Sequence, residues 1–275
     1  MEKAYHQHPS ITSQTLRGND MRIVCQFSCG AASAVATKLA ISEHPQVEII
    51  NAFLKEEHPD NRRFLSDCEG WFGQPVTTLR DDKYNASAYE VFRREKFIKS
   101  QSGAPCSFRL KKKMLDAWKQ PGDVMVMGYT IEEKDRYETF CERNPTLKVD
   151  APLIRHELEK SDCLAIIENA GIEIPYMYKI GYHNANCIGC PKGGKGYWNK
   201  IKIDFPETFN AMAEIQEDLG EGSYFWPALT GDNKRISLRE LPPTAGNHNS
   251  EPDITCSFYC VMASDFVGNQ ELPEA

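Results

Sequence analysis

The sequence FSCGAAS, residues 27–33, joins the apolar run MRIVCQF, residues 21–27, to a segment with Ala31, Val35 and Leu39 at helical spacing. A strand that ends in small residues and continues into a helix directs backbone N–H groups beyond its end, where the helix dipole favours an anion. We expect this anion site at Ser28, Cys29, Gly30 and Ser33. The alternative is that small residues simply make a tight connection, with a serine as the helix cap.

Outward from this turn, short β-like runs alternate with helical segments. The expected strands are residues 21–27, 47–53, 75–79 and 124–129, and the expected helices follow residue 31, follow Asp60-Asn61, and cover 87–98, 108–118, 155–172 and 206–219. Strands that alternate with helices predict an α/β fold, a Rossmann-like parallel sheet with helices on both faces. We expect an N-terminal arm at 1–20, the α/β nucleotide-binding domain at 21–180 and a Cys- and Gly-rich metal-binding region at 181–275.

Composition narrows the class of protein. The chain has 275 residues and a net charge of -7, which argues against nonspecific binding to nucleic acid, although the basic run RLKKK, 109–113, could contact phosphate. The absence of an apolar run of roughly 18 residues or of a secretory leader predicts no membrane partner and a cytoplasmic protein. Ten cysteines in a reducing compartment favour metal or redox chemistry over disulfides.

The segment NANCIGCPKGGKGYWNK, 184–200, contains a CxxC motif formed by Cys187 and Cys190. Two thiolates at this spacing converge on one metal centre, and the remaining ligands must come from elsewhere in the chain. The candidates are Cys106, Cys256 and Cys260. Zinc and an iron–sulfur cluster are both compatible with thiolate ligands, and a redox CxxC is a further alternative. We expect four cysteines to be buried apolar thiols: Cys25, Cys68, Cys141 and Cys163.

With GAPCSFRLK at 103–111, MGYTIEEKDR at 127–136 and CIGCPKGGKGYWNK at 187–200 following the turn, the chain resembles the phosphoadenylyl-sulfate (PAPS) reductase family of the PP-loop superfamily. It is most similar to phage and bacterial members of unassigned role. The family's turn reads SGGxDS, so the resemblance implies phosphate or sulfate binding at the matching Ser28, Gly30 and Ser33. Cys29 replaces a glycine, and Ala32 replaces an aspartate that is expected to assist with magnesium or adenylation.

The resemblance also implies a [4Fe-4S] cluster, with zinc as the alternative. The cluster-bearing relatives use a Cys-Cys pair and a later CxxC, which map onto Cys106, Cys187 and Cys190, with Pro105 at the fourth position. Cys256 or Cys260 would complete the cluster from the tail, or one iron would stay open to hold sulfur. The family's reductase tail, ECGxH, is absent, and Cys256 is its nearest stand-in.

Two further residues are expected to meet the nucleotide. Gly128 lies at the carboxyl end of a predicted strand, the edge where ligands bind in open α/β sheets, and Arg136 could pair with a phosphate or could simply lie on a solvated helix face. Lysines beside the CxxC could balance thiolate charge or be ordinary surface residues: Lys192, Lys195 and Lys200.

These observations predict a protein that binds ATP or a related adenine nucleotide or sulfonucleotide. With its cluster it would act in sulfur transfer or reduction on a nucleotide or nucleic acid, with a sulfur-donor protein as a further partner. The alternative is a catalytically inactive nucleotide-binding sensor or assembly module with a structural metal. We also expect a homo-oligomer.

Overall fold

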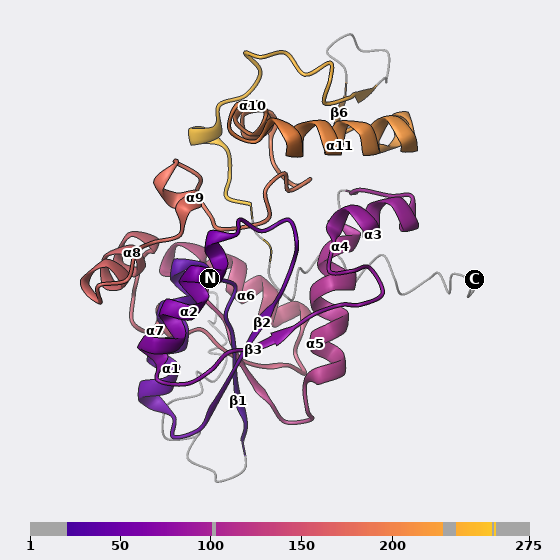
Figure 1. Ribbon diagram of the computed structural model, residues 1–275. Helices are drawn as coiled ribbons and strands as arrows, with labels where there is room; N and C mark the ends of the chain where they lie inside the picture. Colours follow the sequence, from indigo (N-terminus) through magenta and orange to yellow (C-terminus); the bar gives the residue numbers. More distant parts are fainter. Residues whose placement is uncertain (1–20, 101–102, 228–234, 255, 257–275) are drawn as a thin grey trace, which may run out of the picture.

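The computed structural model describes residues 21–100, 103–227, 235–254 and 256 (Figure 1). Its centre is a five-stranded parallel sheet in the order β3-β2-β1-β4-β5. The strands are β1 Ile23–Gln26, β2 Val47–Ala52, β3 Thr77–Leu79, β4 Val124–Val126 and β5 Lys148–Asp150. The sheet confirms the α/β class.

Helices cover both faces of this sheet (Figure 1). On one face, Cys25, Ile49 and Val126 pack with α1 Ala31–Glu43, α2 Asp60–Phe72 and α8 Lys160–Asn169. On the other, Val24, Ile50 and Met125 pack with α3 Ala88–Glu95, α5 Lys113–Trp118 and α6 Lys134–Arg143. Successive strand residues point to opposite faces, so the continuous apolar runs of β1 and β4 supply both cores.

The remaining elements are short helices, two C-terminal helices and a small hairpin. The short helices are α4 Pro105–Ser107, η1 Phe108–Lys112, η2 Ile131–Glu133, α7 Pro152–Arg155, α9 Tyr176–Lys179, η3 Glu221–Ser223 and η4 His248–Ser250. The two C-terminal helices are α10 Lys195–Asp204 and α11 Pro206–Leu219, and β6 Trp226–Pro227 pairs antiparallel with β7 Arg235–Ile236.

Two expected helices have other bounds in the structure, and two elements were not predicted. The helix expected at 108–118 starts earlier, at α4, and contains the π-helical turn η1; the helix expected at 155–172 is confined to α8, because Glu157 has a left-handed backbone that separates it from α7. Strand β5 and helix α10 were not predicted. β5 has three residues and one apolar side chain, and α10 follows a glycine-rich run that carries no helical periodicity.

The described part of the region 181–275 shares a core with the sheet. Trp198 of α10 and Met212 of α11 belong to the same buried cluster as Val24 and Ile50, and α11 packs against α3. In Figure 1 these two helices lie above the carboxyl ends of the strands. The predicted arm, 1–20, lies outside the described residues.

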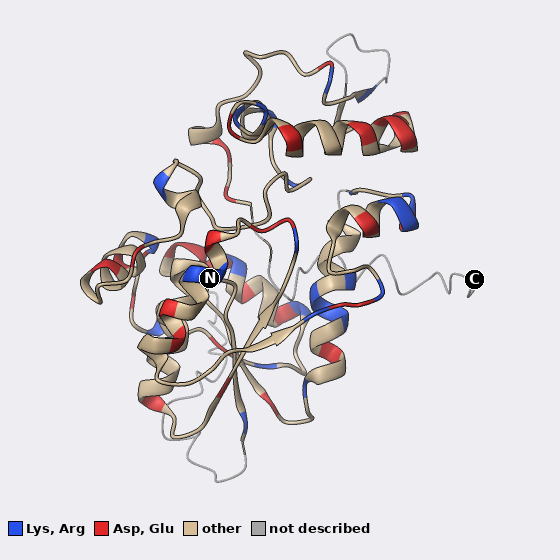
Figure 2. Ribbon diagram, viewed as in Figure 1, with Lys and Arg blue, Asp and Glu red and all other residues tan. Residues whose placement is uncertain are grey.

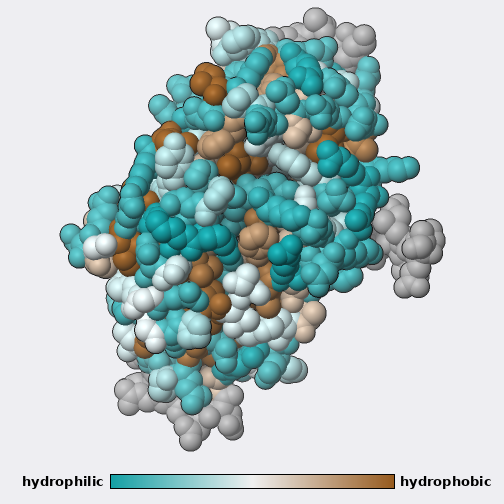
Figure 3. Space-filling model, viewed as in Figure 1, coloured by the Kyte–Doolittle hydropathy of each residue, from teal (hydrophilic) through white to brown (hydrophobic). Residues whose placement is uncertain are grey.

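The surface is mostly polar. On the face in Figure 3, apolar residues form small patches between hydrophilic ones, and no helix of the described residues is long and apolar enough to cross a membrane. Basic side chains gather on η1 and at the end of α3, while α11 is acidic (Figure 2). Within the run 109–113, Arg109 pairs with Glu95 and Lys112 with Asp116, so much of its charge is neutralised locally.

Candidate functional site

A cavity of about 270 Å³ lies beyond the carboxyl ends of β1 and β4. From β1 the chain adds β2 and then β3 on one side of the sheet, whereas β4 and β5 are added on the other side of β1. The order of the strands therefore switches direction between the parallel neighbours β1 and β4. Such topological switch points are where open α/β sheets bind ligands. We call this space the switch-point cavity; Ser28, Gly30 and Ser33 line it, as does Gly128.

The turn before α1 is held by its own hydroxyl groups. Ser33 Oγ accepts a hydrogen bond from the amide of Ser28 at 3.1 Å and donates to the carbonyl of Gly30 at 2.9 Å, and the Ser28 and Ser33 hydroxyls lie 3.1 Å apart. Gly30 is the N-cap residue and the first turn of α1 contains no acidic side chain. Either hydroxyl can turn its proton towards an anion, although Ser33 would then give up its hydrogen bond to the Gly30 carbonyl.

Unlike its neighbours Ser28 and Gly30, Cys29 does not line the switch-point cavity. Its side chain is fully buried on the other side of the turn, where Asn51 Nδ2 lies 3.5 Å and Arg62 Nη2 3.7 Å from the sulfur. Burial raises the pKa of this thiol. The thiol is not among the groups that line the switch-point cavity, so a contact between Cys29 and a ligand there would come from its backbone, which has φ 58°.

Gly128 allows the end of β4 to approach the start of α1. A Cβ atom at this position would lie 2.9 Å from the Cα and the amide nitrogen of Ser33. No side chain fits at that distance, so glycine is required for the two cavity walls to meet. Gly128 therefore has a packing role in addition to lying at the sheet edge, where the sequence predicted it.

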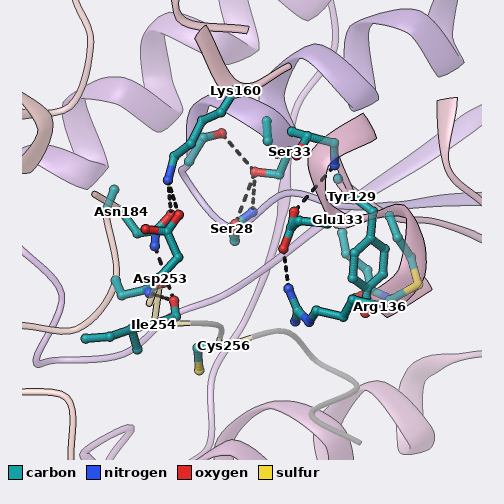
Figure 4. A pocket seen from close by; sticks show the side chains of 18 of the residues that line it. Ser28, Ser33, Tyr129, Glu133, Arg136, Lys160, Asn184, Asp253, Ile254 and Cys256 are labelled. Atoms are coloured by element: carbon teal, nitrogen blue, oxygen red, sulfur yellow. Dashed lines mark hydrogen bonds and ion pairs between the residues drawn. The ribbon is translucent and has the colours of Figure 1, made fainter. Parts of the chain in front are cut away.

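Arg136 also lines the switch-point cavity, but it already has partners (Figure 4). Its guanidinium forms an ion pair with Glu133 and lies 4.9 Å from the centre of the Tyr129 ring. A phosphate would have to share this cation with Glu133. Two lysines that carried no nucleotide-binding prediction line the same cavity: Lys111 from η1 and Lys160 from the first position of α8.

Four of the five predicted metal ligands lie around a second, smaller cavity. Cys106, Cys187, Cys190 and Cys256 line it together, and we call them the four-thiol site. All four are free thiols: Cys106 and Cys190 are buried, and Cys187 and Cys256 are half-buried. The fifth candidate, Cys260, lies outside the described residues. The four cysteines come from three separate segments of the chain: helix α4, the CxxC motif and the tail.

The surroundings of the four-thiol site raise the pKa of three of its thiols and lower that of the fourth. Burial raises the pKa of Cys106, of Cys187 and of Cys190, the last to about 11. For Cys256 burial acts in the same direction, but the ammonium groups of Lys111 and Lys192 and a hydrogen bond with Ser107 outweigh it and lower the pKa to about 7.

Lys111 lines both cavities. Its side chain is buried at 6% exposure. Burial opposes its charge, yet Cys256, Glu57 and Cys187 raise its pKa overall, so it stays protonated. Lys111 lies in the π-helical turn η1, a distortion that often occurs at functional sites. The basic run in the sequence pointed to this residue, but not to its burial between two cavities.

The spacing of the thiols bears on the metal they could hold. Around one zinc ion, four sulfur atoms would lie about 3.8 Å apart, given a Zn–S distance of about 2.3 Å. Among the described residues, the group Glu43, His44 and Asp150 has three candidate ligand atoms within 4.8 Å of one another. No set of described residues that includes these cysteines meets that distance. In every set of three of these thiols, at least one sulfur–sulfur distance therefore exceeds 4.8 Å; in a cubane cluster each thiolate binds a separate iron.

The group Glu43, His44 and Asp150 is a surface cluster. Arg155 forms ion pairs with both carboxylates, at 2.6 Å to Glu43 and 2.9 Å to Asp150. The carboxylates are therefore already neutralised by a guanidinium, and nothing about this group indicates a bound metal.

Comparisons with known proteins add a fold likeness. No family model and no curated protein matches the sequence. Among solved structures, the chain is similar to a PAPS reductase from Candida auris in a phosphate complex, with 12% identity and a TM-score of 0.43 over 60% of this chain and 80% of that one. It is also similar to the U34-tRNA thiolase NcsA from Methanococcus maripaludis with its [4Fe-4S] cluster, with 12% identity and a TM-score of 0.35 over 73% of this chain and 72% of that one.

At these scores neither structure carries an argument about function. The fold class comes from the sheet itself: a doubly wound, Rossmann-like α/β protein with a cavity at the switch point.

Proposed function

We propose that this protein binds ATP or a related adenine nucleotide in the switch-point cavity and a [4Fe-4S] cluster on the four-thiol site. The pair of sites would serve sulfur transfer or reduction on a nucleotide or nucleic-acid substrate. One observation carries this proposal: the two cavities share Lys111, Asn186 and Cys256 in their walls. A ligand in the larger cavity would therefore lie next to the thiols.

The residues of the switch-point cavity suit an oxyanion. The hydroxyls of Ser28 and Ser33 and the N-terminus of α1 would bind phosphate or sulfate, and Gly128 keeps that wall close to β4. Lys111 would face both the anion and the sulfur ligands, where its buried charge balances the negative charge of both. When bound, the cluster would supply electron transfer or a soft metal centre for sulfur.

Cys256 gives the cluster a complete set of four ligands. With the tail cysteine in place of the second residue of a Cys-Cys pair, no iron need remain open. This arrangement supports electron transfer more than direct capture of sulfur at an open iron. Ala32 lines the cavity at the position where the PP-loop pattern has a carboxylate. The missing carboxylate supports nucleotide binding more than adenylation.

A second candidate function is that of a catalytically inactive nucleotide sensor or assembly module with a structural metal site. Ala32 and the complete set of four thiols also favour this function. Ala32 removes a carboxylate from the cavity, and four thiolates would close the metal site to substrates. Turnover separates this candidate from the enzyme.

The test begins with anaerobically purified protein. ATP binding is measured by calorimetry, and release of pyrophosphate from ATP is measured with RNA or DNA as acceptor. The proposal predicts ATP binding, with pyrophosphate release that is slow, because Ala32 provides no carboxylate, and that appears only when an acceptor is added. Binding without turnover on any acceptor would favour the sensor, and absence of binding would refute the nucleotide site. A cytoplasmic location, a homo-oligomeric state and a sulfur-donor partner remain predictions.

A further inference from the structure

The switch-point cavity has a second cationic corner, on the other side of the serine turn from Arg136 (Figure 4). Lys160 enters it from α8, and its ammonium donates to Asp253 Oδ2 at 2.5 Å and to Asn184 Oδ1 at 3.2 Å. The other carboxylate oxygen of Asp253 lies 3.0 Å from His183 Nδ1. Two oxygen atoms of one anion are thus held by two separate side-chain nitrogen atoms.

The anion in this corner belongs to the chain itself. Asp253 comes from the C-terminal tail, far in sequence from Lys160, and lines the cavity that the serine turn also lines. A phosphate or sulfate group offers the same paired oxygen acceptors with more negative charge. The carboxylate of Asp253 therefore stands where an oxyanion of a ligand would bind.

The ion pair between Asp253 and Lys160 is weak enough for a ligand to displace the carboxylate. Its side chain is 44% exposed and that of Lys160 27%. Half-exposed ion pairs of this kind contribute about 0.2–1 kcal/mol. An incoming phosphate could therefore replace the carboxylate at small cost.

Asp253 lies in a tail segment, residues 251–254, that crosses the cavity and leads to Cys256. The segment is fixed at its other end by Glu251, which accepts hydrogen bonds from the amides of Gly196 and Tyr197 at 2.6 and 2.9 Å. Asn186 donates to the carbonyl of Ile254 at 2.6 Å. Of the tail's charged contacts, the ion pair between Asp253 and Lys160 is one that a cavity ligand would meet, because both residues line the cavity.

We propose that Lys160 and His183 form a second oxyanion subsite at the edge of the switch-point cavity, which Asp253 occupies in the ligand-free protein. A phosphate or sulfate group of the bound ligand displaces Asp253 and loosens residues 251–254. Ligand binding in the switch-point cavity is then coupled to the tail that supplies Cys256 to the four-thiol site. This proposal rests on the proposed nucleotide site and adds a subsite and a competitor to it.

The test compares Asp253→Asn with Asp116→Asn. Asp116 is a matched control, because its carboxylate also lies between two ammonium groups, those of Lys112 and Lys119 at 2.6 Å each, on α5 and outside both cavities. Affinities for ATP, for inorganic phosphate and for sulfate are measured by calorimetry on the full-length protein. Asp253→Asn is expected to bind each of them roughly two- to fivefold more tightly than the wild type, from removal of a competing ion pair of up to about 1 kcal/mol. Asp116→Asn should bind them as the wild type does.

Hydrogen exchange of the amides in 251–254 gives a second measurement that does not depend on activity. Saturating ATP should speed exchange in this segment of the wild type, and Asp253→Asn should show fast exchange without ligand. Phosphate and sulfate in separate arms identify which oxyanion the subsite prefers.

The outcomes separate the two proposals. If ATP binds with equal affinity to the wild type and Asp253→Asn, or if it slows exchange in 251–254, Asp253 is no competitor and the second subsite is wrong while the nucleotide cavity stands. If neither protein binds ATP, phosphate or sulfate, both proposals fail together.

Discussion

Replacement of Gly128 by alanine tests whether the close contact between β4 and α1 shapes the switch-point cavity. The added Cβ would lie 2.9 Å from the Cα and amide nitrogen of Ser33 and 3.1 Å from the carbonyl carbon of Ala32. Ordinary carbon contacts are about 3.5–4.0 Å, so the start of α1 must move by roughly 0.6–1 Å. Overpacking of this kind costs about 1–3 kcal/mol of the free energy of unfolding.

The expected result is a melting temperature lower by roughly 2–12 °C, at about 2–4 °C per kcal/mol for a chain of this size. Because Ser33 moves with the helix, ATP affinity should fall by about tenfold. Calorimetry measures both quantities on the same protein.

Gly70→Ala is the matched control. Gly70 is exposed within α2, and nothing lies within 4 Å of its added Cβ. Alanine there should raise the free energy of unfolding by about 1 kcal/mol through helix propensity, and ATP affinity should stay unchanged. If Gly128→Ala were as stable as the wild type and bound ATP equally well, the contact between β4 and α1 would have no role in the cavity.

Two further substitutions test other parts of the structure. Cys256→Ser should lower the iron and acid-labile sulfide content of anaerobically purified protein and change the low-temperature EPR spectrum of its reduced form, whereas Cys141→Ser, on α6 and outside both cavities, should match the wild type; equal iron content in both variants would exclude Cys256 as a ligand. Asp123→Asn should cost about 1–3 kcal/mol of the free energy of unfolding at pH 7, because Asp123 accepts hydrogen bonds from Arg22 at 2.9 and 2.7 Å. Burial opposes the charged carboxylate, but these bonds and one from the Gln120 amide hold the pKa of Asp123 below its usual value. Its contribution is therefore present above the unfolded pKa of about 3.9 and is lost as the pH falls through the folded value, so the denaturation curves of wild type and variant should converge in acid; a gap that persists at pH 2 would contradict this.

The sequence was sufficient for the sheet and for most of the helices. Residues 23–25 and 124–127 are continuous apolar runs that are buried on both faces of the sheet, and helix α11 coincides with the predicted range 206–219. Strand β5 escaped prediction because its three residues include two charged side chains and it lies at the edge of the sheet. Helix α10 is stabilised by the burial of Tyr197, Trp198 and Ile201, a tertiary effect that the glycine-rich sequence before it conceals.

The candidate site was predicted in part. Spacing identified the CxxC pair, and the lone Cys106 was singled out by its position after Pro105; the structure places both beside Cys256. The corner formed by Lys160 and Asp253 had no sequence signal, because a single lysine and a single aspartate 93 residues apart resemble ordinary surface charges. Cys29 was expected to bind the ligand with its neighbours, but the direction of a side chain in a left-handed turn cannot be read from the sequence.

Metal analysis of anaerobically purified protein tests the proposed iron–sulfur site most directly. Iron, zinc and acid-labile sulfide are measured on the same sample, together with its absorption spectrum. A [4Fe-4S] cluster on Cys106, Cys187, Cys190 and Cys256 predicts a brown protein with about four irons and about four sulfides per chain and broad absorption in the blue. A colourless protein that contains about one zinc and no sulfide per chain would contradict the cluster and leave a structural zinc site in its place.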